Sequence, residues 1–188
     1  MILYIDSDAA YLVLPQARSR IAGYFRLSNK NTDNISKDNG AILIECKQLR
    51  WVVSSVAEAE TCGVFHNAII GVNLRNILIA MGHPQPPTKI VTDNAVTDGF
   101  VNRNIQLKKS KSWDMHLHWL RDRNKRNEFH VIWKKSKDNG ADYFTKVTFP
   151  TTYHRHIRAK YIKDALNLLV EKLNVIRNVN IPGTERVC

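Results

Sequence analysis

Apolar and polar positions alternate in several short segments of the first third of the chain, as they do in β-strands. Residues 2–8 are an apolar run that ends in acidic and hydroxyl side chains, and residues 23–28 are a second strand-like segment. The polar residues 29–40 separate it from a third segment, residues 41–53. Consecutive strands joined by such connections predict an antiparallel meander of three strands.

The pattern changes to a helical period at Ser54. Ser55 is followed three residues later by Glu58, which is the spacing of a capping box at the start of a helix. Apolar residues keep helical spacing from Phe65 to Met81, and Gly82 and the following His-Pro pair end the segment. We therefore expect one long helix between Ser55 and Gly82.

The rest of the chain alternates between strands and helices. Residues 89–92 and 128–133 are strand-like, and residues 95–104, 111–123, 138–146 and 157–177 are helical in pattern. This order predicts an α/β fold with one mixed five-stranded sheet, three antiparallel strands and then parallel strands, flanked by helices. A chain of 188 residues can form one core. We expect one domain over residues 1–150 and a basic helical extension and tail over residues 151–188.

The chain is strongly basic, and the excess charge is concentrated in one stretch. It has 28 Lys and Arg against 17 Asp and Glu, a formal net charge of +11. Eleven of the basic residues, but only three acidic ones, lie between Arg103 and Lys137. A regional excess of positive charge is typical of a surface that binds a polyanion such as nucleic acid.

Neither the cysteines nor the apolar segments indicate a disulfide-bonded or membrane-spanning protein. Cys46, Cys62 and Cys188 are odd in number and lack the spacing of a disulfide framework or a metal site. We therefore expect an intracellular, reduced protein. The N-terminus lacks the pattern of a signal peptide, and the most apolar stretch, residues 63–81, is interrupted by His, Asn and Arg. No membrane association is predicted.

Four carboxylates lie at places where separate elements could bring them together. Asp8 closes the first strand, and Asp93 follows the fourth. Glu60 lies in the first turns of the long helix, and Asp142 opens a late helix. Carboxylates that are close together repel, and divalent cations such as Mg²⁺ remove that cost. The pattern alone also fits acids that serve as helix caps or solvated loop residues.

A series of motifs resembles the ribonuclease H segment of the Pol polyproteins of copia-type LTR retrotransposons. The resemblance covers about residues 3–162. Its specificity comes from the number, order and spacing of the motifs, since each motif is short. They are Ser7-Asp8-Ala9-Ala10-Tyr11-Leu12, Ala17-Arg18-Ser19-Arg20, Ala57-Glu58-Ala59-Glu60, Gly82-His83-Pro84-Gln85-Pro86-Pro87-Thr88, Thr92-Asp93-Asn94 and Ala141-Asp142-Tyr143-Phe144-Thr145-Lys146.

The resemblance implies a ribonuclease H-like fold and an endonuclease that hydrolyses the RNA strand of RNA–DNA hybrids in reverse transcription. It implies two Mg²⁺ ions, for which Mn²⁺ can substitute, and no small-molecule cofactor. It also implies a reverse transcriptase domain as a partner and a location in a cytoplasmic particle or the nucleus. The catalytic and metal-binding residues that it implies are Asp8, Glu60, Asp93 and Asp142.

Two of these assignments have a neighbouring competitor. Asp6 and Asp8 lie on the same face of the first strand, so either could reach the site. The Ser-Asp-Ala string matches the family at Asp8, which we prefer. Glu58 is already accounted for by the capping box, and the surroundings of Glu60 match the family, so we prefer Glu60.

The basic stretch flanks Asp142 in sequence and supplies the expected phosphate contacts. Such contacts give affinity without reading base sequence, which suits an enzyme that accepts any hybrid. Trp113, Trp119 and Trp133 lie among these charges, and we expect them to anchor the core rather than to stack on bases. The residues expected to bind nucleic acid are Lys108, Lys109, Lys111, Arg121, Lys134, Lys135 and Lys137.

Two other functions fit the same residues. A catalytically inactive or repurposed ribonuclease H-like remnant would bind nucleic acid without cutting it. A related nuclease of this fold would cut DNA instead. All four acids are present, which favours an active enzyme over a remnant, and cleavage of hybrid but not of duplex DNA would exclude a deoxyribonuclease.

Overall fold

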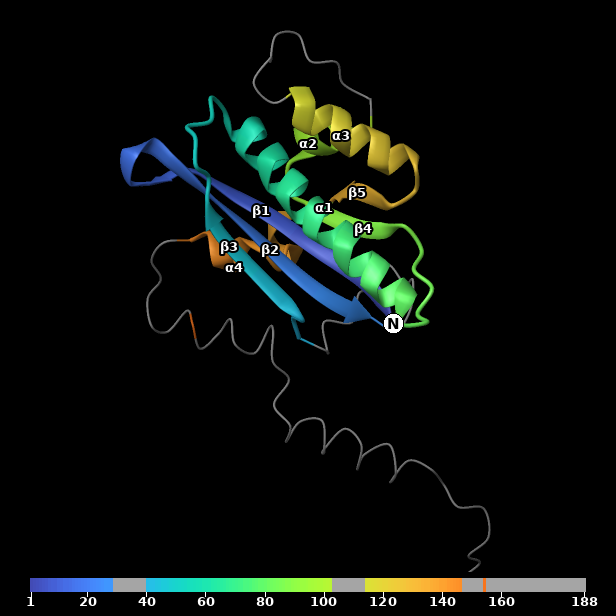
Figure 1. The fold of residues 1–188 in the computed structure, drawn as a ribbon. Coiled ribbons are helices and arrows are strands. Elements are labelled where there is room, and N and C mark those ends of the chain that lie inside the picture. Colours follow the sequence, from blue (N-terminus) through green and yellow to red (C-terminus); the bar gives the residue numbers. More distant parts are fainter. Residues whose placement is uncertain (29–39, 103–113, 147–153, 155–188) are drawn as a thin grey trace, which may run out of the picture.

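The fold is built on one mixed five-stranded sheet, shown by a computed structural model that describes residues 1–28, 40–102, 114–146 and 154 (Figure 1). The strand order is β3-β2-β1-β4-β5. β1 and β2 pair antiparallel, as do β2 and β3, whereas β4 pairs in parallel with both β1 and β5. This confirms the predicted sheet. The strands are β1 (Ile2–Leu14), β2 (Arg18–Ser28), β3 (Leu43–Gln48), β4 (Thr88–Thr92) and β5 (Phe129–Trp133).

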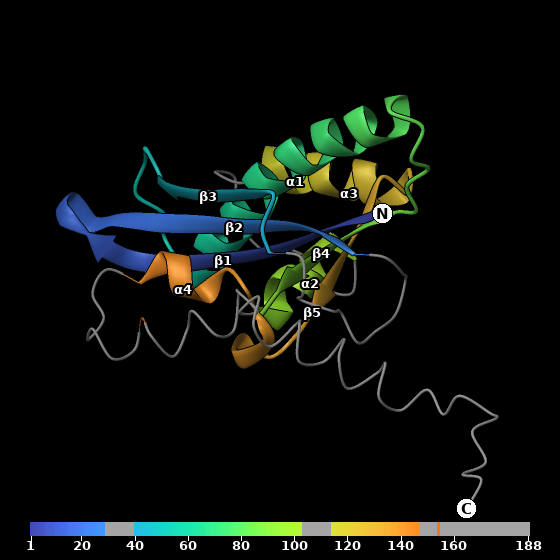
Figure 2. The same cartoon turned by 90° about the horizontal axis from the view of Figure 1, so that it is seen from below.

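Helices cover both faces of the sheet (Figure 2). The long α1 packs against β1 and β2 and against α3, while α4 contacts β1 and β2 from the opposite face. The expected helix over residues 157–177 and the expected domain boundary at residue 150 lie outside the described residues. The helices are α1 (Val56–Ala80), α2 (Ala95–Val101), α3 (Asp114–Lys125) and α4 (Asp142–Thr145), with short 3-10 turns at Pro15–Ala17 and Ser136–Asp138.

The alternation of side chains along β2 separates the two faces. Phe25 is fully buried in a core cluster with Val64 and Ala68 of α1. Its neighbour Tyr24 points the other way, into a cluster with Ala141 and Phe144 at α4. Because successive side chains of a strand alternate between faces, one strand supplies apolar surface to both helical layers.

The N-terminus of α1 is fixed by the predicted cap. The Ser55 hydroxyl accepts a hydrogen bond from the backbone N–H of Glu58 at 3.1 Å. The Glu58 carboxylate accepts bonds from the N–H and the hydroxyl of Ser54, at 2.7 and 2.6 Å, one residue earlier than in a standard capping box. This cap determines where the first turns of α1, and therefore Glu60, lie.

A polar contact in the interior sets the distance between α1 and the sheet. The side-chain amide of Asn67 donates to the Ser7 hydroxyl and to the Ala22 carbonyl, each at 2.9 Å. Gly23 makes room for this contact, because a Cβ there would lie 2.2 Å from the Asn67 Oδ1 atom. α1 is thereby held close to β1 beside Asp8.

The first two strands are longer than predicted. β1 continues past Asp8 to Leu14, and β2 begins at Arg18 rather than at Gly23. Both strands extend because their pairing continues, with Ala9 opposite Ile21. The register shifts before Leu14. The expectation that Asp8 closes the strand is therefore wrong. β3 is shorter than the predicted segment 41–53.

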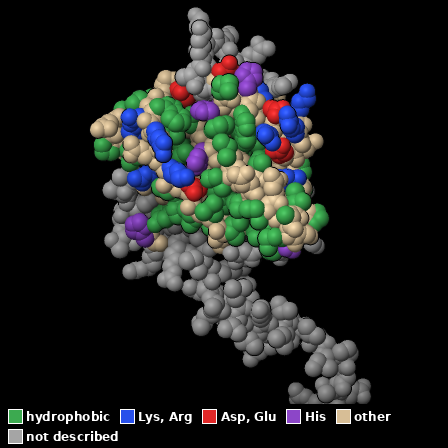
Figure 3. All heavy atoms as spheres, viewed as in Figure 1, with side chains coloured by type: hydrophobic (Ala, Val, Ile, Leu, Met, Phe, Trp, Pro, Cys, Tyr) green, Lys and Arg blue, Asp and Glu red, His purple; other side chains and the backbone are tan. Residues whose placement is uncertain are grey.

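α1 has apolar side chains on its outer face as well (Figure 3). Ile69, Ile77 and Ile79 are between 38% and 54% exposed. Within the described part of the chain, α1 has the length and the mean hydropathy, 1.2, of a membrane-spanning helix. A core helix meets the same criteria, and α1 lies along the sheet with much of its first half buried.

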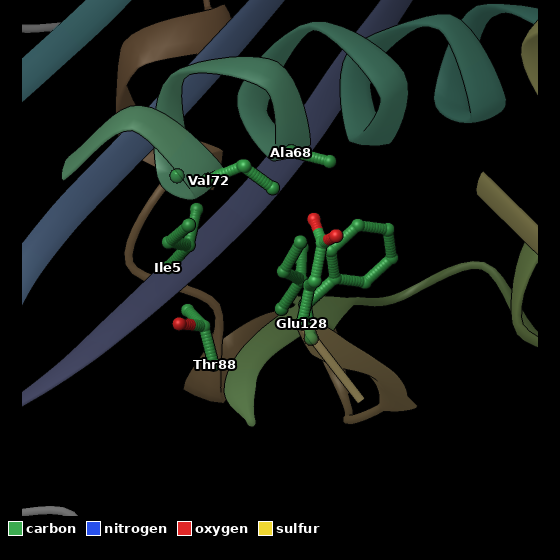
Figure 4. A pocket seen from close by; sticks show the side chains of 8 residues that line it. Ile5, Ala68, Val72, Thr88 and Glu128 are labelled. Carbon is green, nitrogen blue, oxygen red and sulfur yellow. The ribbon is translucent and has the colours of Figure 1, made fainter. Parts of the chain in front are cut away.

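A small pocket lies between α1 and the sheet (Figure 4). It is too narrow to hold a water molecule, and its lining is mainly apolar. It adjoins the first residues of β4 and β5, whereas Asp93 follows the other end of β4, so the pocket is separate from the acidic residues. Its lining residues are Ile5, Ala68, Gly71, Val72, Thr88, Ile90, Glu128 and Phe129.

Candidate metal centre

Parallel pairing of two strands brings two of the four acids together. β1 and β4 are neighbours in register, with Asp6 opposite Val91, so Asp8 and Asp93 lie side by side two residues further on. Glu60 reaches them from the second turn of α1. One carboxylate oxygen from each of Asp8, Glu60 and Asp93 lies within 4.8 Å of the other two. The structure therefore brings together these three predicted acids.

Asp142 adjoins this acidic group from α4, the helix on the other face of the sheet. Its Oδ1 atom is 2.7 Å from Nζ of Lys146, one helical turn later. Thr145 donates its hydroxyl to Oδ2 of Asp8, and the same hydroxyl lies 2.9 Å from the Asp142 carbonyl. The end of α4 is thus linked to the acid on β1.

Burial shapes the electrostatics of the acidic group. Asp8 and Glu60 are each 4% exposed. Burial raises the pKa of Asp8 to about 6 against the opposing hydrogen bond from Thr145, and the negative charge of Asp93 adds to the rise. Burial also raises the pKa of Glu60 well above its usual range, helped by the charges of Asp8 and Asp93.

One oxygen of this group has no hydrogen-bond partner in the described part of the chain. Glu60 Oε2 is buried and accepts no hydrogen bond from any of the described residues. An unpartnered buried carboxylate oxygen beside two other carboxylates is costly unless a cation neutralises the charge. The donor atoms are all carboxylate oxygens, which are the ligands that Mg²⁺ and Mn²⁺ prefer. The residues present therefore fit a divalent cation of this kind.

In the absence of divalent cations, the stability of the protein should fall as the pH rises from about 4 to about 7. The pKa of Asp8 is raised in the folded protein from 3.8 to about 6, so folding favours the protonated form. The contribution of Asp8 to the free energy of unfolding is fully present below pH 3.8. It is lost as the pH rises through 6, and the loss is about 3 kcal/mol. Thermal unfolding in EDTA across this range measures it. An Asp8→Asn variant should lack this part of the decline, and identical profiles would contradict the assignment.

Asp6 lies on the same strand face as Asp8 but is tied to other partners. It is 1% exposed, and its Oδ1 atom is 3.3 Å from the Arg26 guanidinium. Its Oδ2 atom accepts a hydrogen bond from the Gly140 N–H at 3.1 Å. Asn139 donates to the Ser7 carbonyl at 2.8 Å, which fastens the same loop. Asp6 thus holds the segment that leads into α4, which supports the preference for Asp8.

The expected nucleic-acid contacts are only partly described. Lys108, Lys109 and Lys111 lie outside the described residues. Arg121 donates its Nε–H to the Phe100 carbonyl at 2.8 Å, so it has a partner within the domain. Lys134, Lys135 and Lys137 follow β5 on the way to α4, and the last two are exposed. Nucleic-acid binding by all of these residues stays a prediction.

Trp133 does not anchor the core as predicted. It is 46% exposed, because it ends β5 at the edge of the sheet, and its indole N–H donates to the Asp93 carbonyl at 2.9 Å. It therefore helps to hold the backbone of Asp93. Trp119 does pack against the core, and Trp113 lies outside the described residues.

Thr145 and Lys146 were not singled out from the sequence, although both contact the acids. They follow Asp142 by three and four residues, the spacing that places side chains on one side of a helix. Their position within the Ala-Asp-Tyr-Phe-Thr-Lys motif and this spacing were the available signals.

The mixed five-stranded sheet with helices on both faces fits a ribonuclease H-like fold. The chain matches no protein-family model, and a comparison with curated proteins finds no match. Among solved structures it is similar to LC11-RNase H1, isolated from compost by a metagenomic approach, at a TM-score of 0.52 and 12% identity, over 76% of this chain and 90% of that one. LC11-RNase H1 in complex with an RNA/DNA hybrid gives a TM-score of 0.51 and 11% identity, over 76% and 91%. At these identities the likeness shows the fold, and the predicted fold class is confirmed.

Proposed function

We propose that this chain is an endonuclease that hydrolyses the RNA strand of RNA–DNA hybrids, as part of a copia-type retrotransposon Pol polyprotein. The observation that carries the proposal is the acidic group of Asp8, Glu60 and Asp93, with oxygens within 4.8 Å of one another on a ribonuclease H-like sheet. The complex of LC11-RNase H1 with an RNA/DNA hybrid supports the substrate class. The family resemblance of the motifs supports the retrotransposon origin.

In this proposal Asp8, Glu60, Asp93 and Asp142 hold two Mg²⁺ ions, or Mn²⁺ in their place. When bound, the ions supply Lewis-acid stabilisation of the charge that develops on the phosphate oxygens during hydrolysis. The chain itself orients the ligands. Because Asp8 and Glu60 are buried, water screens their negative charges less than it would at the surface. The Thr145 hydroxyl orients the Asp8 carboxylate.

The surroundings of the acidic group suit a polyanionic substrate. Lys135 and Lys137 are exposed in the connection between β5 and α4, close in sequence to Asp142, where they can bind phosphates of the hybrid. The proposal includes a reverse transcriptase domain as a partner that presents the hybrid. It also places the protein inside the cell, in a cytoplasmic particle or the nucleus.

Cleavage of defined substrates tests the proposed function. The purified chain is incubated with Mg²⁺ and either an RNA–DNA hybrid, duplex DNA or single-stranded RNA, each labelled on one strand. We expect internal cuts in the RNA of the hybrid alone, and none with an Asp93→Asn variant. Cleavage of duplex DNA would show a deoxyribonuclease instead. Binding of the hybrid without cleavage in Mg²⁺ or Mn²⁺ would favour the inactive remnant.

A further inference from the structure

We propose that the ammonium group of Lys146 acts as a built-in counter-ion of the acidic group in the metal-free protein and competes there with divalent cations. This inference rests on the proposed function, because it takes the four acids to be metal ligands. It assigns Lys146 the role of a positioning residue that tunes how strongly the metal is held.

One positive charge is paired with Asp142 and interacts electrostatically with the other three acids. Nζ of Lys146 is 2.7 Å from Oδ1 of Asp142. Burial raises the pKa of Asp8 and of Glu60, and the charge of Lys146 opposes part of that rise. In return, although burial lowers the pKa of Lys146, its bond to Asp142 and the charges of Asp8 and Asp93 raise it. Within the described residues, this lysine therefore interacts with every member of the acidic set.

The backbone of Lys146 is held by a hydrogen bond, whereas its side chain is partly exposed to solvent. Its carbonyl accepts a hydrogen bond from the Arg20 guanidinium at 3.1 Å, and the preceding Thr145 is bonded to Asp8. The Lys146 side chain is 43% exposed, so its ammonium can turn toward solvent without crossing the core. The pair of Asp6 and Arg26 differs, because both of those side chains are at most 3% exposed.

Competition follows from the charges. One ammonium relieves part of the repulsion between the carboxylates, but a divalent cation that enters the same space repels it. The ammonium must then leave Asp142. Losing that contact costs free energy, so the net free energy of metal binding becomes less favourable. Removing the charge should therefore weaken the metal-free fold and strengthen metal binding. A purely structural lysine would weaken the fold without strengthening metal binding.

The test measures metal affinity and stability without any nuclease assay. Binding of Mn²⁺ is followed by electron paramagnetic resonance for the parent protein and for Lys146→Met and Lys146→Gln, and thermal unfolding is recorded in EDTA. We expect both variants to bind Mn²⁺ about fivefold more tightly. Their Tm in EDTA should be lower by about 2–4 °C. Lys125→Met is the matched control, because Lys125 is exposed at the end of α3, near the start of β5.

Unchanged or weaker Mn²⁺ binding by both Lys146 variants would overturn the inference, as would an equal gain in Lys125→Met. An Asp93→Asn variant separates this failure from failure of the proposed function. If the parent binds Mn²⁺ and Asp93→Asn does not, the metal centre stands whatever the lysine variants show. If the parent does not bind Mn²⁺, both proposals fall.

Discussion

Replacing Glu60 with Gln is expected to slow hybrid cleavage by about a hundredfold to a thousandfold while raising the stability of the metal-free protein. The two effects share one cause. The Glu60 carboxylate is buried beside Asp8 and Asp93, and its Oε2 atom has no partner among the described residues. Removing the negative charge relieves repulsion in the absence of metal but also removes a ligand of the proposed metal centre.

Glu58→Gln is the matched control, two residues away on the same helix. The Glu58 carboxylate is also buried, but it accepts hydrogen bonds from the Ser54 N–H and hydroxyl. Its replacement should cost about 0.5–2 kcal/mol of stability, as for other lost helix caps, and leave the cleavage rate near that of the parent. Single-turnover cleavage rates and thermal unfolding in EDTA measure both variants. If Glu58→Gln slowed cleavage and Glu60→Gln only lowered stability, Glu58 would be the catalytic residue and Glu60 the structural one.

Side-chain periodicity was sufficient to predict the sheet and the long helix, but not the ends of the strands. The strand-like pattern of residues 23–28 and the helical spacing after Ser55 are local patterns, and the structure confirms the elements that they predict. β1 continues beyond Asp8 because Ala9 pairs with Ile21 of β2. That pairing depends on a residue distant in sequence, so no local pattern reports it.

In the candidate site, too, local patterns predicted some residues, whereas contacts between distant residues decided others. The position of Asp93 after β4 and of Glu60 at the start of α1 followed from local patterns and the family resemblance. The choice between Asp6 and Asp8 could not be made by geometry, since both lie on one face of β1. In the structure it is Arg26 and Gly140 that engage Asp6, and Gly140 is 134 residues away along the chain.

Because Arg26 and Gly140 engage Asp6, replacing Asp6 is expected to have a large effect on stability. Replacing Asp6 with Ala should lower the free energy of unfolding by about 3–5 kcal/mol. Arg26 is 2% exposed, and its Nε and one terminal nitrogen already lack hydrogen-bond partners among the described residues. Without Asp6 its charge would be buried with no carboxylate to balance it. Urea unfolding of the parent and the variant measures the loss.

Two comparisons separate this structural role from catalysis. The double variant Asp6→Ala with Arg26→Met should recover much of the stability, because an apolar side chain replaces the uncompensated charge. Asp8→Ala removes a carboxylate from the same strand face, yet it should abolish cleavage without a comparable loss of stability. Burial, and then the charges of Asp93 and Asp142, already disfavour the ionised form of Asp8. Asp6→Ala should also reduce cleavage, because the Gly140 contact that positions α4 and Asp142 is lost. If Asp6→Ala were stable and inactive while Asp8→Ala were unstable, Asp6 would be the metal ligand.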